Sequence, residues 1–119
     1  MNDMIKVIDK YLFIQMPKEL DHHNSEIIRK KADRIIETRN INMIIFDFEN
    51  TEFMDSSGIG IILGRYKNIS MSGGSVAAIH LNNRMKKIFV MSGLYKVVSV
   101  LEDVPIENVS GEKQWKIIK

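Results

Sequence analysis

The chain contains no cysteine, which excludes disulfide bonds and any zinc site built from thiolate ligands. Its first residues lack the basic start and uninterrupted apolar stretch of a signal peptide, and no apolar run approaches the ~20 residues that a membrane-spanning helix needs. The net charge is also small. The 17 basic and 15 acidic residues leave a net charge of +2, which is too small to imply a polyanionic partner. We therefore expect a cytoplasmic protein with no nucleic-acid partner and no membrane partner.

The remaining composition is that of an ordinary globular domain. The chain is 119 residues long, 45% hydrophobic and 27% charged, and a chain of this length buries about 65% of its unfolded surface on folding. We expect a single domain over residues 1–119. The segment 105–119 stays unassigned, because Pro105 and Gly111 interrupt any helix there. A strand, a helical turn and a docked tail all stay open for residues 114–118.

Apolar periodicity alternates between strand-like and helical along the chain. Two β-prone runs parted by Asp9-Lys10 predict a hairpin with a tight turn. Parallel neighbours joined by right-handed crossovers are the default for the alternating elements that follow. We therefore expect an α/β fold with a mixed sheet of about five strands. The predicted strands are Ile5–Ile8, Tyr11–Met16, Met43–Phe48, Ser75–Ile79 and Val97–Leu101; the predicted helices run from Asn24 to about Arg39, from about Ser56 to before Gly73, and from Asn82 or Asn83 to Gly93.

The most informative segment is Asp55-Ser56-Ser57-Gly58-Ile59-Gly60, between a buried strand and an amphipathic helix. Its two hydroxyls lie beside a helix N-terminus, where unpaired N–H groups and the helix dipole favour anionic groups. One interpretation is capping of the helix by Asp55 or Ser56. The other is phosphorylation, which adds nearly two negative charges at that helix end. The segment by itself favours capping, because Asp and Ser precede many helices.

The helix that follows has an unusual predicted outer face. With Ile59, Ile62, Leu63, Tyr66 and Ile69 turned inward, the outward residues are Gly60, Ile61, Gly64 and Asn68. A glycine inside a helix costs about 1 kcal/mol relative to alanine. The two glycines either admit a neighbouring helix of the same domain or form a flat surface that another protein approaches closely. Their position directly after Ser56 favours the second interpretation.

Residues 19–23, Glu-Leu-Asp-His-His, hold potential metal ligands, but the chain has no His-Glu-x-x-His spacing and His80 stands alone at a strand end. A polar loop whose Asp21 or Asn24 caps the first helix is the favoured interpretation. The glycines after Ser57 do not match the dinucleotide fingerprint, because Leu63 stands where the third glycine belongs. We predict no metal and no cofactor.

Other charged groups are assigned no chemistry. Asp47 and Asp55 do not predict an aspartyl-phosphate receiver, since the first two strands bring no acidic pair to complete its magnesium site. The basic clusters Lys30-Lys31-Arg34 and Arg84-Lys86-Lys87 are interpreted as solvated helix faces, not as a nucleic-acid footprint.

Residues 53–67 resemble the signature of the STAS-domain anti-sigma factor antagonists, and among them the sporulation members. Segments 19–23 and 91–96 match the same family in order, so the resemblance covers roughly residues 5–101. It implies a binding protein, not an enzyme. In that family the serine after the motif aspartate, here Ser56, is phosphorylated by the anti-sigma factor, itself a serine kinase. The unphosphorylated form binds that kinase and frees the sigma factor, which is only an indirect partner, and a separate serine phosphatase reverses the modification.

The resemblance also implies contacts with the kinase. In the family the loop that holds Asp21 and His22 lies beside the phosphorylation site. The residues expected to shape the loop or to contact the partner are Asp21, His22, Asp55, Ser57, Gly58, Gly60, Ile61, Gly64, Asn83 and Arg84.

The chain departs from the family pattern in two places. Pro17-Lys18 replaces the Thr-Gly type of turn before Glu-Leu-Asp, and residues 105–119 lack the expected regular terminal helix. Two alternative functions stay open at this point: a STAS module of a different assembly, such as a stress-signalling complex, and a small-ligand or nucleotide-binding domain that uses the Ser56 loop to hold an anion.

Overall fold

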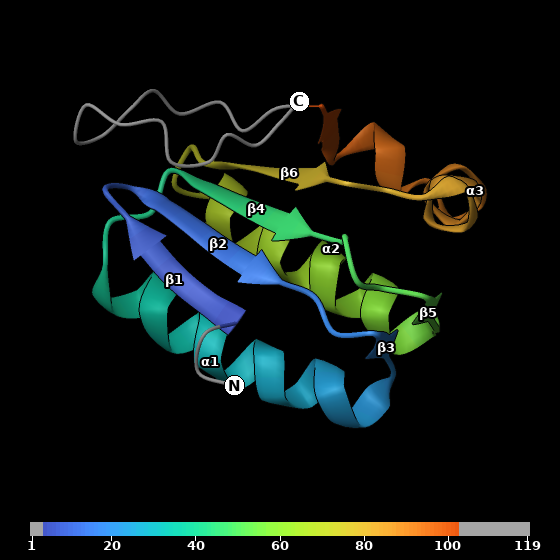
Figure 1. The fold of residues 1–119 in the computed structure, drawn as a ribbon. Coiled ribbons are helices and arrows are strands. Elements are labelled where there is room, and N and C mark those ends of the chain that lie inside the picture. Colours follow the sequence, from blue (N-terminus) through green and yellow to red (C-terminus); the bar gives the residue numbers. More distant parts are fainter. Residues whose placement is uncertain (1–3, 103–119) are drawn as a thin grey trace.

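A twisted sheet with two long helices against one of its faces forms the body of the molecule (Figure 1). The computed structural model describes residues 4–102. The five-stranded sheet has the order β1-β2-β4-β6-β7, and a separate two-stranded sheet joins β3 to β5. The elements are β1 (Ile5–Ile8), β2 (Tyr11–Gln15), β3 (Glu19–Leu20), α1 (His22–Thr38), β4 (Met43–Asp47), β5 (Phe53–Met54), α2 (Ser56–Ser70), β6 (Ser75–Ile79), α3 (Asn83–Ser92), the 3-10 turn η2 (Leu94–Lys96) and β7 (Ser99–Leu101).

The predicted α/β fold with a mixed five-stranded sheet is confirmed. β1 and β2 form the expected antiparallel hairpin, in which Ile8 faces Tyr11 across a two-residue turn. Asp9 in that turn has a φ of 56°, the left-handed conformation that Asp tolerates better than most residues. The other pairs of the sheet, β2 with β4, β4 with β6 and β6 with β7, are parallel.

The helix boundaries follow from identifiable caps. Asp21 is the N-cap of α1, where its side chain accepts a hydrogen bond from the Asn24 N–H at 3.0 Å, so the helix begins two residues earlier than predicted. Asn82 caps α3 in the same way, at 2.8 Å from the Met85 N–H. Gly93, with a φ of 83°, ends α3 as expected.

The last strand is shorter than predicted. Residues 94–96 form a 3-10 turn, and the Val97 and Val98 N–H groups both donate to the Leu94 carbonyl, at 3.0 and 2.9 Å. These bonds keep both valines out of the strand ladder, so β7 begins at Ser99.

The main hydrophobic core lies between the sheet and the three helices. Its members include Phe46 and Phe48, which are fully buried, and Phe89 of α3, whose ring meets Phe48 edge-on at 5.6 Å between centroids. Met85 and Phe89 therefore point inward, as predicted. A second cluster of Ile45, Ala77 and Ile79 lies on the opposite face of the sheet.

The predicted outward position of Ile61 is wrong. This side chain is 4% exposed and belongs to the main core. α2 is covered on two sides, by the sheet and by the neighbouring α1, so its apolar surface is wider than the single stripe assumed from periodicity (Figure 1). A neighbouring helix of the same domain, α1, therefore covers Ile61. Ile62 and Ile69 do point inward as expected.

Within residues 4–102, none of the helices has the length and apolar character needed to cross a membrane. The interpretations of the segment 105–119 lie outside the described residues.

Candidate functional site

Ser56 is the first residue of α2, and its side chain is exposed. Capping is done by Asp55: its Oδ1 accepts hydrogen bonds from the Ser57 N–H at 2.8 Å and from the Gly58 N–H at 3.4 Å. Ser56 makes no side-chain hydrogen bond to another described residue. The capping interpretation thus belongs to Asp55, which leaves the Ser56 hydroxyl open to modification.

The loop of Asp21 and His22 lies beside the Ser56 loop, as the family resemblance implied. β3 and β5 pair in parallel, so the residues that follow each strand begin a helix at the same edge. The Ser57 Oγ lies 3.5 Å from His22 Nδ1. No carboxylate among the described residues bonds the other ring nitrogen of His22, so the pair lacks the oriented base of a serine hydrolase.

The start of α3 closes another side of the Ser56 loop. Asn82 Nδ2 donates to the Thr51 carbonyl, and Arg84 Nη1 donates to the Glu52 carbonyl, both at 3.1 Å. Thr51 is fully buried, and its hydroxyl donates to the Pro17 carbonyl at 2.9 Å. The structure therefore brings Arg84 beside the loop, with Asn83 exposed next to it. Sequence analysis missed Thr51, because its importance comes from contacts 34 and 31 residues away.

The three glycines of the motif have different surroundings. A Cβ atom on Gly58 would lie 2.5 Å from Met54 Cγ and 2.9 Å from Leu20 Cδ2, so this buried position requires glycine for close packing. A Cβ on Gly60 or Gly64 would meet nothing within 4 Å. Gly58 shapes the site from inside, whereas Gly60 and Gly64 leave the open side of α2 flat.

A buried cation joins α2 to α1, and sequence analysis did not predict it. Arg65 is 6% exposed, and its Nε lies 3.0 Å from Asp33 Oδ1. That contact is an ion pair without hydrogen-bond alignment, and the Nη1 atom has no hydrogen-bond partner. Burial lowers the pKa of the Arg65 guanidinium, and the Asp33 carboxylate opposes this effect. Arg65 lies four residues after Ile61, on the side of α2 that faces α1. Periodicity had placed that side in solvent, so it contained no signal for a buried Arg65.

We expect Asp33→Ala to lower the free energy of unfolding by about 3 kcal/mol, because it leaves a buried guanidinium without its counter-charge. Arg65→Met removes the buried charge itself and should cost much less. Denaturant unfolding of both variants measures the difference. Equal losses for the two variants would contradict this account and would assign the stabilisation to ordinary packing.

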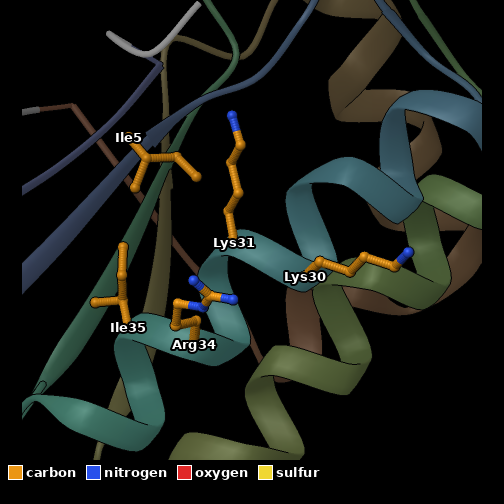
Figure 2. Close-up of a pocket in the computed structure, with 5 residues that line it drawn as sticks. All are labelled: Ile5, Lys30, Lys31, Arg34 and Ile35. Atoms are coloured by element: carbon orange, nitrogen blue, oxygen red, sulfur yellow. The ribbon is translucent and has the colours of Figure 1, made fainter.

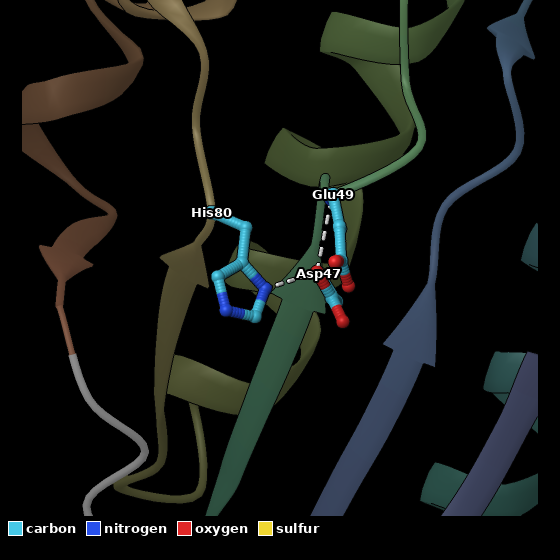
Figure 3. A group of neighbouring side chains, drawn as sticks. All are labelled: Asp47, Glu49 and His80. Carbon is cyan, nitrogen blue, oxygen red and sulfur yellow. Dashed lines mark hydrogen bonds and ion pairs between the residues drawn. The ribbon is translucent and has the colours of Figure 1, made fainter. Parts of the chain in front are cut away.

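His80 does not stand alone, contrary to prediction. Its Nδ1 lies 2.8 Å from Asp47 Oδ1, and Glu49 lies beside them (Figure 3). Because β4 and β6 are neighbours, the ends of these strands bring residues 47 and 80 together. The three side chains could offer ligand atoms within 4.8 Å of one another to a divalent ion. Hydrogen bonds from His80 and from the Glu49 N–H to Asp47 already account for the arrangement.

The first basic cluster lines a shallow hollow of about 380 Å³ between β1 and α1. Figure 2 shows the five residues that line it, with Lys31 and Arg34 beside Ile5 and Ile35. All three cations are exposed, as expected for a solvated helix face. None of the lining residues belongs to the Ser56 loop or to its neighbours.

Comparison with known proteins gives one consistent result. The STAS domain family model matches residues 3–111. The chain is similar to an anti-sigma F factor antagonist of Paenibacillus polymyxa, with 39% identity over 77% of this chain and 79% of that protein. It is also similar to an anti-sigma F factor antagonist of Lysinibacillus sphaericus, with 35% identity over 82% of this chain and 85% of that protein. An anti-sigma-B factor antagonist of Bacillus subtilis is 23% identical over 81% of this chain and 86% of that protein.

Two solved structures share the fold. The anti-sigma factor antagonist SpoIIAA in its unphosphorylated form superposes with a TM-score of 0.71, at 29% identity, over 84% of this chain and 87% of that chain. The Bacillus cell fate determinant SpoIIAA in the phosphorylated form superposes with a TM-score of 0.68, at 33% identity, over 82% of this chain and 88% of that chain.

Proposed function

This chain belongs to the STAS domain family, and we propose that it is an anti-sigma factor antagonist that phosphorylation of Ser56 switches off. The observation that carries the proposal is the placement of Ser56: exposed, first in α2, with its hydroxyl free of the capping bonds that Asp55 makes. The existence of both an unphosphorylated and a phosphorylated SpoIIAA structure with this fold supports a phosphorylation switch.

In the proposed cycle the unphosphorylated domain binds an anti-sigma factor and so releases the sigma factor. The anti-sigma factor is also the kinase, and it uses ATP and Mg²⁺ to modify Ser56, which ends the association. A serine phosphatase restores the binding form. The domain acts as ligand and phosphate acceptor, and the catalytic groups belong to its partners.

The higher identity to anti-sigma F than to anti-sigma-B factor antagonists, 39% against 23%, favours the sporulation pathway over a stress-signalling assembly. Nucleotide binding at the Ser56 loop has less support. The N–H groups of Ser57 and Gly58 already donate to Asp55, so the donors that would hold a phosphate group of a ligand are occupied.

Incubation with the partner kinase and MgATP is expected to place one phosphate on Ser56 and none on Ser57. The first two positions of a helix differ in direction by roughly 100°, and Ser57 is partly buried, with its Oγ near His22. Mass spectrometry of proteolytic fragments locates the phosphate, and Ser56→Ala is the control. Phosphate found chiefly on Ser57, or still added to Ser56→Ala, would overturn the assignment.

We expect Gly64→Leu to weaken binding to the anti-sigma factor at least tenfold, or ~1.4 kcal/mol, while stability stays equal or rises. A Cβ atom at position 64 would meet nothing within 4 Å in the free domain, and replacing a helical glycine by leucine favours the helix by about 0.8 kcal/mol. In the complex the same side chain would hold the two surfaces apart.

Calorimetry and thermal unfolding measure the two effects of Gly64→Leu separately. Gly64→Ala is the matched control, because it gives a similar gain in helix propensity with a much smaller loss of affinity. A lower melting temperature for Gly64→Leu would show that this side of α2 is internal packing. Unchanged affinity would exclude it from the interface.

A further inference from the structure

The charges of the chain are unevenly distributed. From Ser56 to Leu101 the sequence contains no aspartate and no glutamate, whereas it contains six cations: Arg65, Lys67, Arg84, Lys86, Lys87 and Lys96. Lys86 and Lys87 on α3 are exposed and make no ion pair with another described residue. Within residues 4–102, no ion pair therefore compensates the positive charge of Lys86 and Lys87 on α3.

The same side of α3 also exposes large apolar side chains. Val90 is 63% exposed and Met91 is 85% exposed, one helical turn after Lys86 and Lys87. Met85 and Phe89 on the opposite side are buried, so the inner face of the helix is already satisfied. We call Lys86, Lys87, Val90 and Met91 the α3 outer surface. An apolar centre that includes methionine with charged neighbours is typical of protein–protein interfaces.

The α3 outer surface is joined to the Ser56 loop. The two hydrogen bonds from the side chains of Asn82 and Arg84 to the carbonyls of residues 51 and 52 fix the start of α3 against that loop. α3 has 10 residues and is thus about 15 Å long. A surface of that length is too small for a stable interface alone, but it can extend one that begins at Ser56.

We propose that the α3 outer surface docks an acidic segment with apolar side chains that belongs to the same anti-sigma factor kinase that engages Ser56. This inference rests on the proposed function and names a second contact region for its partner. Charge complementarity selects the occupant: acidic side chains meet Lys86 and Lys87, and apolar side chains cover Val90 and Met91. A second copy of this chain does not fit, since the same cations would face each other across a two-fold axis.

The test is the double variant Lys86→Glu/Lys87→Glu, compared with Lys30→Glu/Lys31→Glu. The control pair consists of two adjacent exposed lysines on α1, so both variants have the same net charge. In stopped-flow association with the kinase at low salt, we expect the α3 variant to bind at least tenfold more slowly than the control, with a weaker dependence on salt. Met91→Ser should instead raise the dissociation rate.

The results separate this proposal from the proposed function. If the α3 variant still receives its phosphate on Ser56 but with a raised KM, both stand. If it associates at the same rate as the control, the α3 proposal fails, although Ser56 remains the acceptor. If the wild type neither binds the kinase nor is phosphorylated, the proposed function fails.

Two other occupants have distinct signatures, and either one would overturn the proposal. Sedimentation of the wild-type protein with phosphatidylglycerol vesicles, lost in the α3 variant, would indicate a lipid surface. A melting temperature lower than that of the control variant would indicate that another part of this chain pairs with Lys86 and Lys87.

Discussion

Phosphorylation of Ser56 is expected to lower the affinity of the domain for its anti-sigma factor by about 10- to 1,000-fold, or ~1.4–4 kcal/mol. The phosphate would stand next to the Asp55 carboxylate, and the nearest helix N–H groups already donate to that carboxylate. The modification therefore adds charge that this domain does not pair. In a complex, unpaired or like charge at a closely packed surface costs several kcal/mol.

The free domain should not rearrange when Ser56 is modified. Ser56 is exposed and makes no side-chain hydrogen bond to another described residue, so the phosphate breaks no such contact and extends into water. The positive end of the α2 dipole also favours negative charge there. Calorimetry of the two forms measures the affinities, and amide NMR spectra report the structure. Ser56→Asp should copy the modified form, and Ser56→Ala should bind persistently in the presence of ATP. Shifts spread across the sheet, or equal affinities, would contradict this mechanism.

Ile61→Asp is expected to lower the free energy of unfolding by more than about 4 kcal/mol. The side chain is 4% exposed, packed in the main core between α2, α1 and the sheet. At this buried position an aspartate carboxylate without a partner has two options. It stays charged, which costs several kcal/mol of folding free energy, or it is protonated because burial raises its pKa. For a domain of this size the melting temperature should fall by roughly 15 °C.

Gly60→Asp is the matched control for Ile61→Asp. It introduces the same side chain one residue earlier on the same helix, where a Cβ would meet nothing within 4 Å beyond the adjoining backbone of its own helix. Its melting temperature should stay close to that of the wild type. If Ile61→Asp left the melting temperature equally unchanged, Ile61 would point outward, as periodicity alone had predicted. It would then again be a candidate for contact with the partner.

Most of the fold could be predicted because local signals agreed with one another. Asp21, Asn82 and Gly93 mark helix ends by hydrogen-bonding chemistry and backbone conformation that act within three residues. Strand Ser75–Ile79 is bounded by glycines on one side and polar residues on the other, and it was predicted without error. The Ser56 loop was found because it combines a capping aspartate with hydroxyls at a helix start.

The errors come from contacts between elements that are distant in sequence. Ile61 is buried because α1 lies beside α2, and a single-helix periodicity contains no information about a second neighbour. Arg65 and Asp33 are paired for the same reason, 32 residues apart along the chain. His80 meets Asp47 only because β4 and β6 are adjacent in the sheet. Such pairings depend on which strands and helices are neighbours in the fold, and the hydrophobic pattern of the sequence does not specify these neighbours.

Two distant stretches of chain hold the loop that ends at Ser56. The Thr51 hydroxyl donates a hydrogen bond to the Pro17 carbonyl, and the Asn82 side chain donates one to the Thr51 carbonyl. These two bonds join residues 34 and 31 positions apart, so they require that distant parts of the chain have already come together. A nascent or misfolded chain consequently presents Ser56 without its surrounding geometry. A partner that recognises this geometry would act only on folded molecules, so the proposed phosphorylation site would also report whether the protein is folded.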